Sequence, residues 1–170
     1  MTDTDTSSEA VDTKNRLSEI VLDPASIARG NANIEHEREV AIYDLLDGNS
    51  FELEGRDEGP YKLSIGLVED RLALSVFSAS EDSSEPIIAH FLSLTPFKRI
   101  MKDYFLVLDS YYQAIRSAQP SRIQAIDVGR RGLHDEGSRV LIERLEGKIK
   151  IDLDTARRLF TLISALHWKG

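Results

Sequence analysis

The pattern of apolar and polar positions divides the chain into a strand-rich first half and a helix-rich second half. In the first half, apolar residues alternate with polar ones over 61–67 and 72–76, which is the period of strands with one buried face. Two further strands are predicted over 16–23 and 86–92, with a short one over 51–54. The 86–92 run is apolar at most positions, so we expect it to be covered on both faces.

In the second half, apolar residues recur at the 3.6-residue spacing of amphipathic helices. This spacing predicts helices over 97–117, over 120–146 and from about 154 to 168, and a similar pattern predicts an earlier helix over 34–46. The apolar face of the 97–117 helix is too wide for a single seam. We therefore expect this helix to be buried on two sides, with surface left for a homodimer contact or a partner-binding groove.

Short polar side chains precede the predicted helices and can accept a hydrogen bond from the first helical turn. Asn33 is the expected N-cap of the first helix, and Asp152 or Asp154 of the last. Thr95 followed by Pro96 is the expected start of the 97–117 helix, because proline suits the first helical position.

These elements predict an α+β fold with a mostly antiparallel sheet of four to five strands and a C-terminal three-helix layer. Residues 1–15 are rich in Asp, Glu, Ser and Thr, with almost nothing to bury, so they are predicted to form a disordered acidic tail. Residues 16–170 are predicted to form a single α+β domain, which suits a chain of 170 residues.

Composition narrows the classes of protein. The absence of cysteine excludes disulfides, thiolate zinc sites and cysteine nucleophiles, and it favours a reducing compartment. No segment is predicted to cross a membrane and none has the features of a signal peptide, so we expect a cytoplasmic location. The net charge is −8, made up of −10 over residues 1–59, −3 over 60–93 and +5 over 94–170. This asymmetry is explained either by an anionic partner of the basic part or by attraction between the parts, within one fold or across a dimer. We give attraction between the parts more weight, because acidic residues are interspersed among the basic ones in the second half.

The segment from Asp127 to Ser138 contains three glycines, two arginines, a histidine and three carboxylates inside a predicted helix. Each helical glycine costs about 1 kcal/mol relative to alanine. Either another part of the chain packs closely against this segment, or the helix breaks there; the sequence leaves both alternatives open.

The same segment carries the candidate chemistry. A histidine and a carboxylate near two guanidinium groups could bind phosphate or assist a proton transfer. The candidate ligand or partner site comprises Arg130, Arg131, His134 and Glu136, with His36 if the fold brings it near. The alternative is a solvated helix face with ion pairs such as Asp127 with Arg131, and we give that alternative more weight. No catalytic residue is assigned, and neither a metal nor a cofactor is expected, because no metal-binding or nucleotide-binding motif occurs.

Several runs of residues resemble a small bacterial protein family of the UPF type, which has no assigned function. They are 33–38 (NIEHER), 93–97 (SLTPF), 102–105 (KDYF), 110–112 (SYY), 129–134 (GRRGLH), 154–160 (DTARRLF) and 166–168 (LHW). The resemblance covers about 16–170 and implies no mechanism and no site residues. Because chains of this family start near Arg16, residues 1–15 are not expected to be essential.

Three functions remain open. We expect a non-catalytic protein-interaction or regulatory domain whose partner is another protein or a second copy. The alternative is a small hydrolase or phosphate-binding enzyme centred on Arg130–Glu136. Nucleic-acid binding comes third: basic pairs occur in the C-terminal helices, but they are scattered, and a pI near 5.0 opposes binding to nucleic acid.

Overall fold

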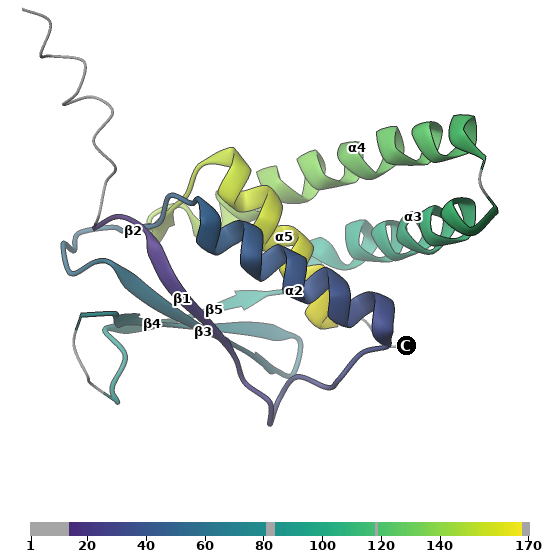
Figure 1. Ribbon diagram of the computed structural model, residues 1–170. Coiled ribbons are helices and arrows are strands. Elements are labelled where there is room, and N and C mark those ends of the chain that lie inside the picture. The colour runs from purple at the N-terminus through teal and green to yellow at the C-terminus, as the bar shows by residue number, and fades with distance from the viewer. Residues whose placement is uncertain (1–13, 81–83, 118, 168–170) are drawn as a thin grey trace, which may run out of the picture.

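The computed structural model describes residues 14–80, 84–117 and 119–167, and it confirms the predicted α+β fold (Figure 1). These residues form four α-helices, a four-stranded sheet and a separate two-stranded sheet. In chain order the elements are β1 (Leu17–Leu22), α2 (Ala32–Asp47), β2 (Glu52–Leu53), β3 (Tyr61–Val68), β4 (Arg71–Ser78), β5 (Ile88–Ser93), the 3₁₀ turn η1 (Thr95–Phe97), α3 (Lys98–Ser117), α4 (Pro120–Leu145), β6 (Ile149–Lys150) and α5 (Leu153–His167). Residues 1–13, most of the predicted tail, lie outside the described residues.

The main sheet has the strand order β1-β3-β4-β5. β3, β4 and β5 are antiparallel neighbours, whereas β1 runs parallel to β3, so the prediction of a mostly antiparallel sheet is confirmed. In β3 the side chains of Tyr61, Leu63 and Ile65 are buried, while Lys62 and Ser64 between them are half-buried. One face of the sheet therefore builds the core.

The prediction that the strand at 86–92 is covered on both faces is wrong. β5 spans Ile88–Ser93 and lies at the edge of the sheet, where β4 is its partner. Of its six residues only Leu92 is buried, and Phe91 is exposed with the Arg71 guanidinium above its ring. The helices form a layer on one face, so the outward side chains of β5 have no second layer to cover them.

The predicted short strand at 51–54 and the extended segment after the 120–146 helix form their own ribbon. β2 pairs antiparallel with β6, with Glu52 opposite Lys150 and Leu53 opposite Ile149. This ribbon does not join the main sheet, and it lies beside the C-terminal end of α4.

Two helices begin with the side-chain caps that their sequences favour. In α2 the cap is Asn31 and not Asn33: the Asn31 Oδ1 accepts a hydrogen bond from the Ile34 backbone nitrogen at 2.9 Å. In α5 the Asp152 Oδ1 accepts from the Thr155 nitrogen at 2.8 Å, so Asp152 is the cap among the two predicted candidates.

The helix α3 differs from its prediction at its start and on its outer face. Thr95 does not cap it, because the chain first makes the turn η1 and the Ser93 hydroxyl accepts from the Thr95 nitrogen. The expected burial on two sides is also wrong, since Leu106 is 62% exposed and Ile115 is 47% exposed.

The helices form a layered body and a projecting hairpin. α5 lies between α2 and α4 and is the most buried helix, with nine of its fifteen residues in the interior. α3 and α4 run antiparallel, and their connected ends project beyond the sheet and α5 (Figure 1). The hairpin therefore has a proximal end in the core and a distal end outside it.

Candidate functional site

The glycine-rich segment is part of one continuous helix. α4 runs from Pro120 to Leu145 through all three glycines, so the helix does not break. Gly137 is required by packing: a Cβ placed there would lie 2.3 Å from Cε1 of Phe160. A Cβ at Gly129 or Gly132 would meet no atom within 4 Å, and nothing in the structure explains these two glycines.

His134 points toward the interior from the middle of α4. Its Nε2 lies 3.2 Å from the Thr161 hydroxyl, and its ring centre lies 5.2 Å from that of Tyr104 and 6.2 Å from that of Phe160. Burial, followed by the positive charges of Arg130 and Arg157, lowers the pKa of His134 to about 4. The imidazole is therefore neutral at pH 7.

Arg130 lies one turn before His134 and is partly buried. Its Nη2 donates to Asp127 Oδ1 at 3.1 Å, and its guanidinium carbon lies 4.7 Å from the ring centre of Tyr111. Within the described part of the chain its buried Nε has no hydrogen-bond partner. The predicted pair between Asp127 and Arg131 is confirmed at 3.0 Å, and the Arg131 side chain is 76% exposed.

The carboxylates after His134 point to different helices. Asp135 pairs with Arg157 of α5 at 3.0 Å, and Glu136 forms an ion pair with Arg99 of α3. His36 lies on the exposed side of α2. The structure thus brings Arg130 and His134 together, whereas Arg131 and His36 face solvent and Glu136 is held by Arg99.

The candidate site predicted from the sequence did not include Glu37, which lies beside His36 and faces α3. Its Oε1 accepts from the Tyr112 hydroxyl at 3.0 Å, and its Oε2 accepts from the Tyr104 hydroxyl at 3.4 Å. The available signal was the pair of tyrosines on an apolar helix face, because a buried phenol needs a hydrogen-bond partner.

The side chains that meet between these helices form what we call the helix-junction cluster. Its members are Glu37 from α2, Tyr104 and Tyr112 from α3, Arg130 and His134 from α4, and Thr161 from α5. Burial and the adjacent Glu37 raise the pKa of Tyr112 to about 12 and raise that of Tyr104 as well. At neutral pH the cluster therefore holds two protonated phenols and a neutral imidazole, and both phenols donate to the side chain of Glu37. These states suit a polar cross-link between helices.

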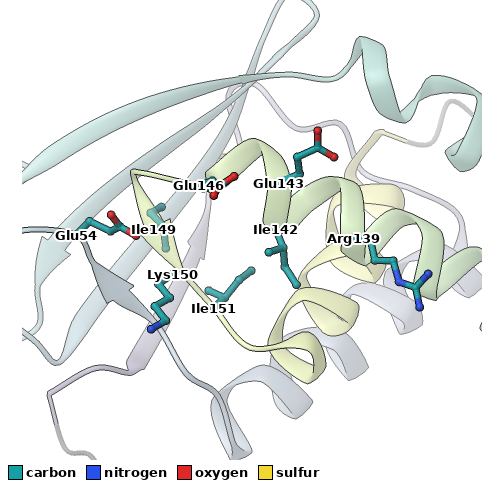
Figure 2. A pocket seen from close by; sticks show the side chains of 8 residues that line it. All are labelled: Glu54, Arg139, Ile142, Glu143, Glu146, Ile149, Lys150 and Ile151. Carbon is teal, nitrogen blue, oxygen red and sulfur yellow. The ribbon is translucent and has the colours of Figure 1, made fainter.

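Two of the hollows outside this cluster are lined by α4. One, of about 470 Å³, lies at the distal end of the hairpin, between Tyr111 and Ile123. The other, of about 530 Å³, lies between the end of α4 and β6 and has an aliphatic floor (Figure 2). Neither is lined by Arg130 or His134. Over the residues that the structure describes, no three His, Asp or Glu side chains are grouped as a metal ion would require.

This combination defines a small α+β protein with a helix-junction cluster and a projecting helical hairpin. The sequence profile of UPF0262, described as an uncharacterised protein family, matches residues 14–169. The chain belongs to this family.

Similar proteins carry the same family name. The UPF0262 protein of Rhodopseudomonas palustris strain TIE-1 is 58% identical over 162 residues, which cover 95% of this chain and 98% of the relative. Those of Methylobacterium radiotolerans and Nitrobacter hamburgensis are 58% and 56% identical, covering 92% and 94% of this chain and 95% of each relative. No solved structure matches. In the described ranges no helix has the length and apolar character needed to span a bilayer.

Proposed function

We propose that this protein is a non-catalytic protein-interaction or regulatory domain of the cytoplasm, and that the distal end of the α3–α4 hairpin is its contact surface. The supporting observation is the distribution of burial along α4. Its four fully buried residues, Gly137, Ser138, Leu141 and Leu145, all lie in the last nine positions of a 26-residue helix.

The distal end nevertheless keeps apolar side chains. Val128 is 66% exposed and Ile115 is 47% exposed, and Ile123 lines the hollow beside Tyr111. An apolar surface on a projecting element is typical of a protein–protein contact. The partner is another protein or a second copy of this chain.

A photo-crosslinking amino acid at position 128 tests this proposal. Cells producing the Val128 variant are expected to yield a discrete crosslinked adduct on irradiation. The same residue in place of Glu19, an exposed position on β1, is the matched control and is expected to yield none. Absence of an adduct at 128, or equal adducts at both positions, would count against the hairpin as the contact surface.

A phosphate-binding or hydrolytic function centred on Arg130–Glu136 is the second candidate. The observation that favours it is the juxtaposition of Arg130 and His134 beside the ring of Tyr104. The other two residues of this segment are less suited to binding phosphate. Glu136 is paired with Arg99, and the Arg131 side chain is exposed to solvent. Calorimetry with inorganic phosphate distinguishes the two functions: binding lost in Arg130→Gln would support the enzyme-type site.

Nucleic-acid binding has the least support, because the basic pairs are engaged within the protein. Lys98 pairs with Asp70, Arg157 pairs with Asp135, and Arg158 donates to the Gly48 carbonyl. This function would be supported if the protein retained nucleic acid at low salt and lost it when Arg157 and Arg158 become alanine.

A further inference from the structure

The two outer strands of the main sheet differ in how their free edges are protected. β1 and β5 each have one edge without a neighbouring strand. At β1 the Asn49 side chain occupies both backbone groups of Leu17: its Oδ1 accepts from the Leu17 nitrogen at 2.7 Å, and its Nδ2 donates to the Leu17 oxygen at 3.0 Å. The register of β1 with β3 is also irregular between Leu17 and Glu19, and Glu19 adds a charge. Covering groups, irregular register and charges keep a strand edge from pairing with another chain.

The edge of β5 has none of these protections between Ala89 and Ser93. This segment, AHFLS, contains no Asp, Glu, Lys, Arg or Pro, and its register with β4 is regular. Within the described ranges, no side chain bonds to the backbone of Ala89, Phe91 or Ser93 as Asn49 does to β1. Phe91, at the centre of the segment, is 50% exposed. An exposed, uncharged edge strand of this kind is suited to pairing with a further strand.

The backbone groups of three residues point away from the sheet. Leu94 directly follows β5, and its backbone nitrogen donates to the Asp70 oxygen at 2.9 Å. Hydrogen-bonded and non-hydrogen-bonded pairs alternate along an antiparallel ladder, so the even-numbered residues of β5 bond to β4. The N–H and C=O groups of Ala89, Phe91 and Ser93 are therefore directed to the open edge.

These three residues are complementary to themselves. When a second β5 lies antiparallel across a two-fold axis at Phe91, the two Phe91 residues are paired, and Ala89 of each copy is paired with Ser93 of the other. Each pair exchanges two N–H to C=O hydrogen bonds, so the contact forms about six. This register keeps the core-facing side chains of both sheets on the same side. No like charges meet, because the paired segment carries no charge.

We propose that β5 is a symmetric dimer interface, at which the edge strands of two copies of this chain pair antiparallel and join their sheets into one. On the open face of the joined sheet the two exposed Phe91 rings lie next to each other. Each ring keeps its own Arg71, whose guanidinium carbon lies 5.2 Å from the ring centre. Such a contact uses one edge twice, as two-fold interfaces do.

The features of the edge favour a second copy over an extended peptide of another protein. A second copy brings a strand that its own sheet already holds in the extended form, whereas a free peptide loses conformational entropy when it is ordered on the edge. A second copy also covers Phe91 with an identical ring, and aromatic pairs across strands stabilise a sheet.

This inference goes beyond the proposed function, because it places self-association on the sheet and not on the hairpin. The two proposals can fail independently. Crosslinking at Val128 reports the hairpin surface, whereas the oligomeric state of β5 variants reports the edge.

Charge pairs at the two ends of the contact test the interface in the full chain. Sedimentation equilibrium of the wild type is expected to show a concentration-dependent dimer. The variant A89K/S93K sets like charges opposite each other at both ends, whereas A89E/S93K sets opposite charges at the same positions. The first is expected to dimerise at least about tenfold more weakly than the second. Both positions are exposed, so equal thermal melting at a concentration where both are monomeric checks that folding is unchanged.

A charge at the axis gives a simpler comparison. Phe91→Lys places two ammonium groups opposite each other and removes the ring pair, so this variant is expected to be monomeric. Val21→Lys makes an apolar-to-lysine change at a 38% exposed position of the other edge strand, β1. It is the matched control, and wild-type dimerisation is expected.

Hydrogen exchange identifies the paired backbone groups directly. When the concentration of the wild type is raised, the amides of Ala89, Phe91 and Ser93 are expected to gain protection. The even-numbered amides of β5 already bond to β4 and are expected to change little.

Three results would overturn the proposal. One is a wild-type protein that stays monomeric at millimolar concentration, including one whose β5 edge is protected only when a different protein binds. Another is a dimer of equal affinity in A89K/S93K and A89E/S93K. The third is a dimer in which the amides of Ala89, Phe91 and Ser93 gain no protection, since that dimer would use another surface.

Discussion

The two halves of α4 contrast within a single helix. Residues 137–145 supply all of its fully buried positions, whereas residues 120–136 supply none. Yet apolar residues recur at helical spacing in both halves, from Ile123 to Leu145. The spacing of apolar residues therefore identifies the helix and its apolar face. Whether that face is buried depends on whether other elements of the fold pack against it.

The halves are also held by different forces. The proximal half packs Gly137 against the ring of Phe160 and places Leu141 in the core. The junction with the distal half is held by polar contacts, among them the Tyr112–Glu37 hydrogen bond and the stacking of Arg130 on Tyr111. Apolar burial gives large free energies, whereas single polar contacts near the surface give about 1 kcal/mol each. Stability is therefore expected to fall steeply from the proximal to the distal half.

The largest expected difference is between buried and exposed aliphatic side chains of this helix. Leu141→Ala removes a fully buried side chain and leaves a cavity, so it should lower the free energy of unfolding by about 3–4 kcal/mol. Val128→Ala, at a 66% exposed position, should change it by less than about 0.5 kcal/mol. Urea unfolding followed by circular dichroism measures both. Similar losses in the free energy of unfolding for the two variants would show that the two halves of α4 do not differ in burial.

The glycines provide the next comparison. Gly137→Ala forces its Cβ into the ring of Phe160 and should cost about 2–3 kcal/mol. Gly132→Ala meets no neighbour and should stabilise the helix by up to about 1 kcal/mol. Changing the contacting residue sharpens the test. In a Phe160→Leu background, where the smaller side chain leaves space, Gly137→Ala should lower the free energy of unfolding by less than it does in the wild type. An additive double variant would contradict the packing explanation.

Much of the fold follows from the sequence because local periodicity determines it. The alternation of Tyr61, Leu63 and Ile65 predicts both the strand β3 and its buried face. The apolar run of β5 correctly predicts a strand, but the prediction that both of its faces are covered is wrong. Whether a layer covers the second face depends on where the helices of the rest of the chain pack, and the run itself does not contain that information.

The candidate site shows the same limit. Arg130 and His134 share a helix face by spacing, and the structure places them together. His36 and Glu37 are adjacent on α2, about 100° apart around the helix, so only the docking of α2 on α3 decides which one reaches the cluster. That docking joins residues 75 positions apart in the sequence, which no local pattern specifies.

The lowered pKa of His134 predicts that the free energy of unfolding depends on pH. Because the folded-state pKa of His134 is lowered from 6.5 to about 4, the unfolded chain binds the proton more tightly. Its contribution to stability is complete above pH 6.5 and falls as the pH decreases toward 4. Between pH 7 and pH 5 this loss amounts to about 2 kcal/mol, at about 1.4 kcal/mol per pKa unit.

Urea unfolding at both pH values, compared between wild type and His134→Gln, isolates this contribution. The variant lacks the titrating group and should lose about 2 kcal/mol less than the wild type over that interval. An NMR titration of the His134 ring provides the direct measurement. A midpoint near 6.5 would show that the imidazole is not desolvated, and the junction would then be as open as the distal half.

The smallest expected effect concerns the polar contact that joins the hairpin to the body. Tyr112→Phe removes a hydroxyl that donates to Glu37 and should lower the free energy of unfolding by about 1 kcal/mol. Tyr43→Phe makes the same chemical change at a 71% exposed tyrosine of α2 and should have almost no effect. Native-state hydrogen exchange adds a local measurement: in Tyr112→Phe, protection should fall in α3 and in the distal half of α4 while residues 138–145 keep theirs. Uniform loss along α4 would show that the two halves open as one unit, and the hairpin could not then act as a separately held arm.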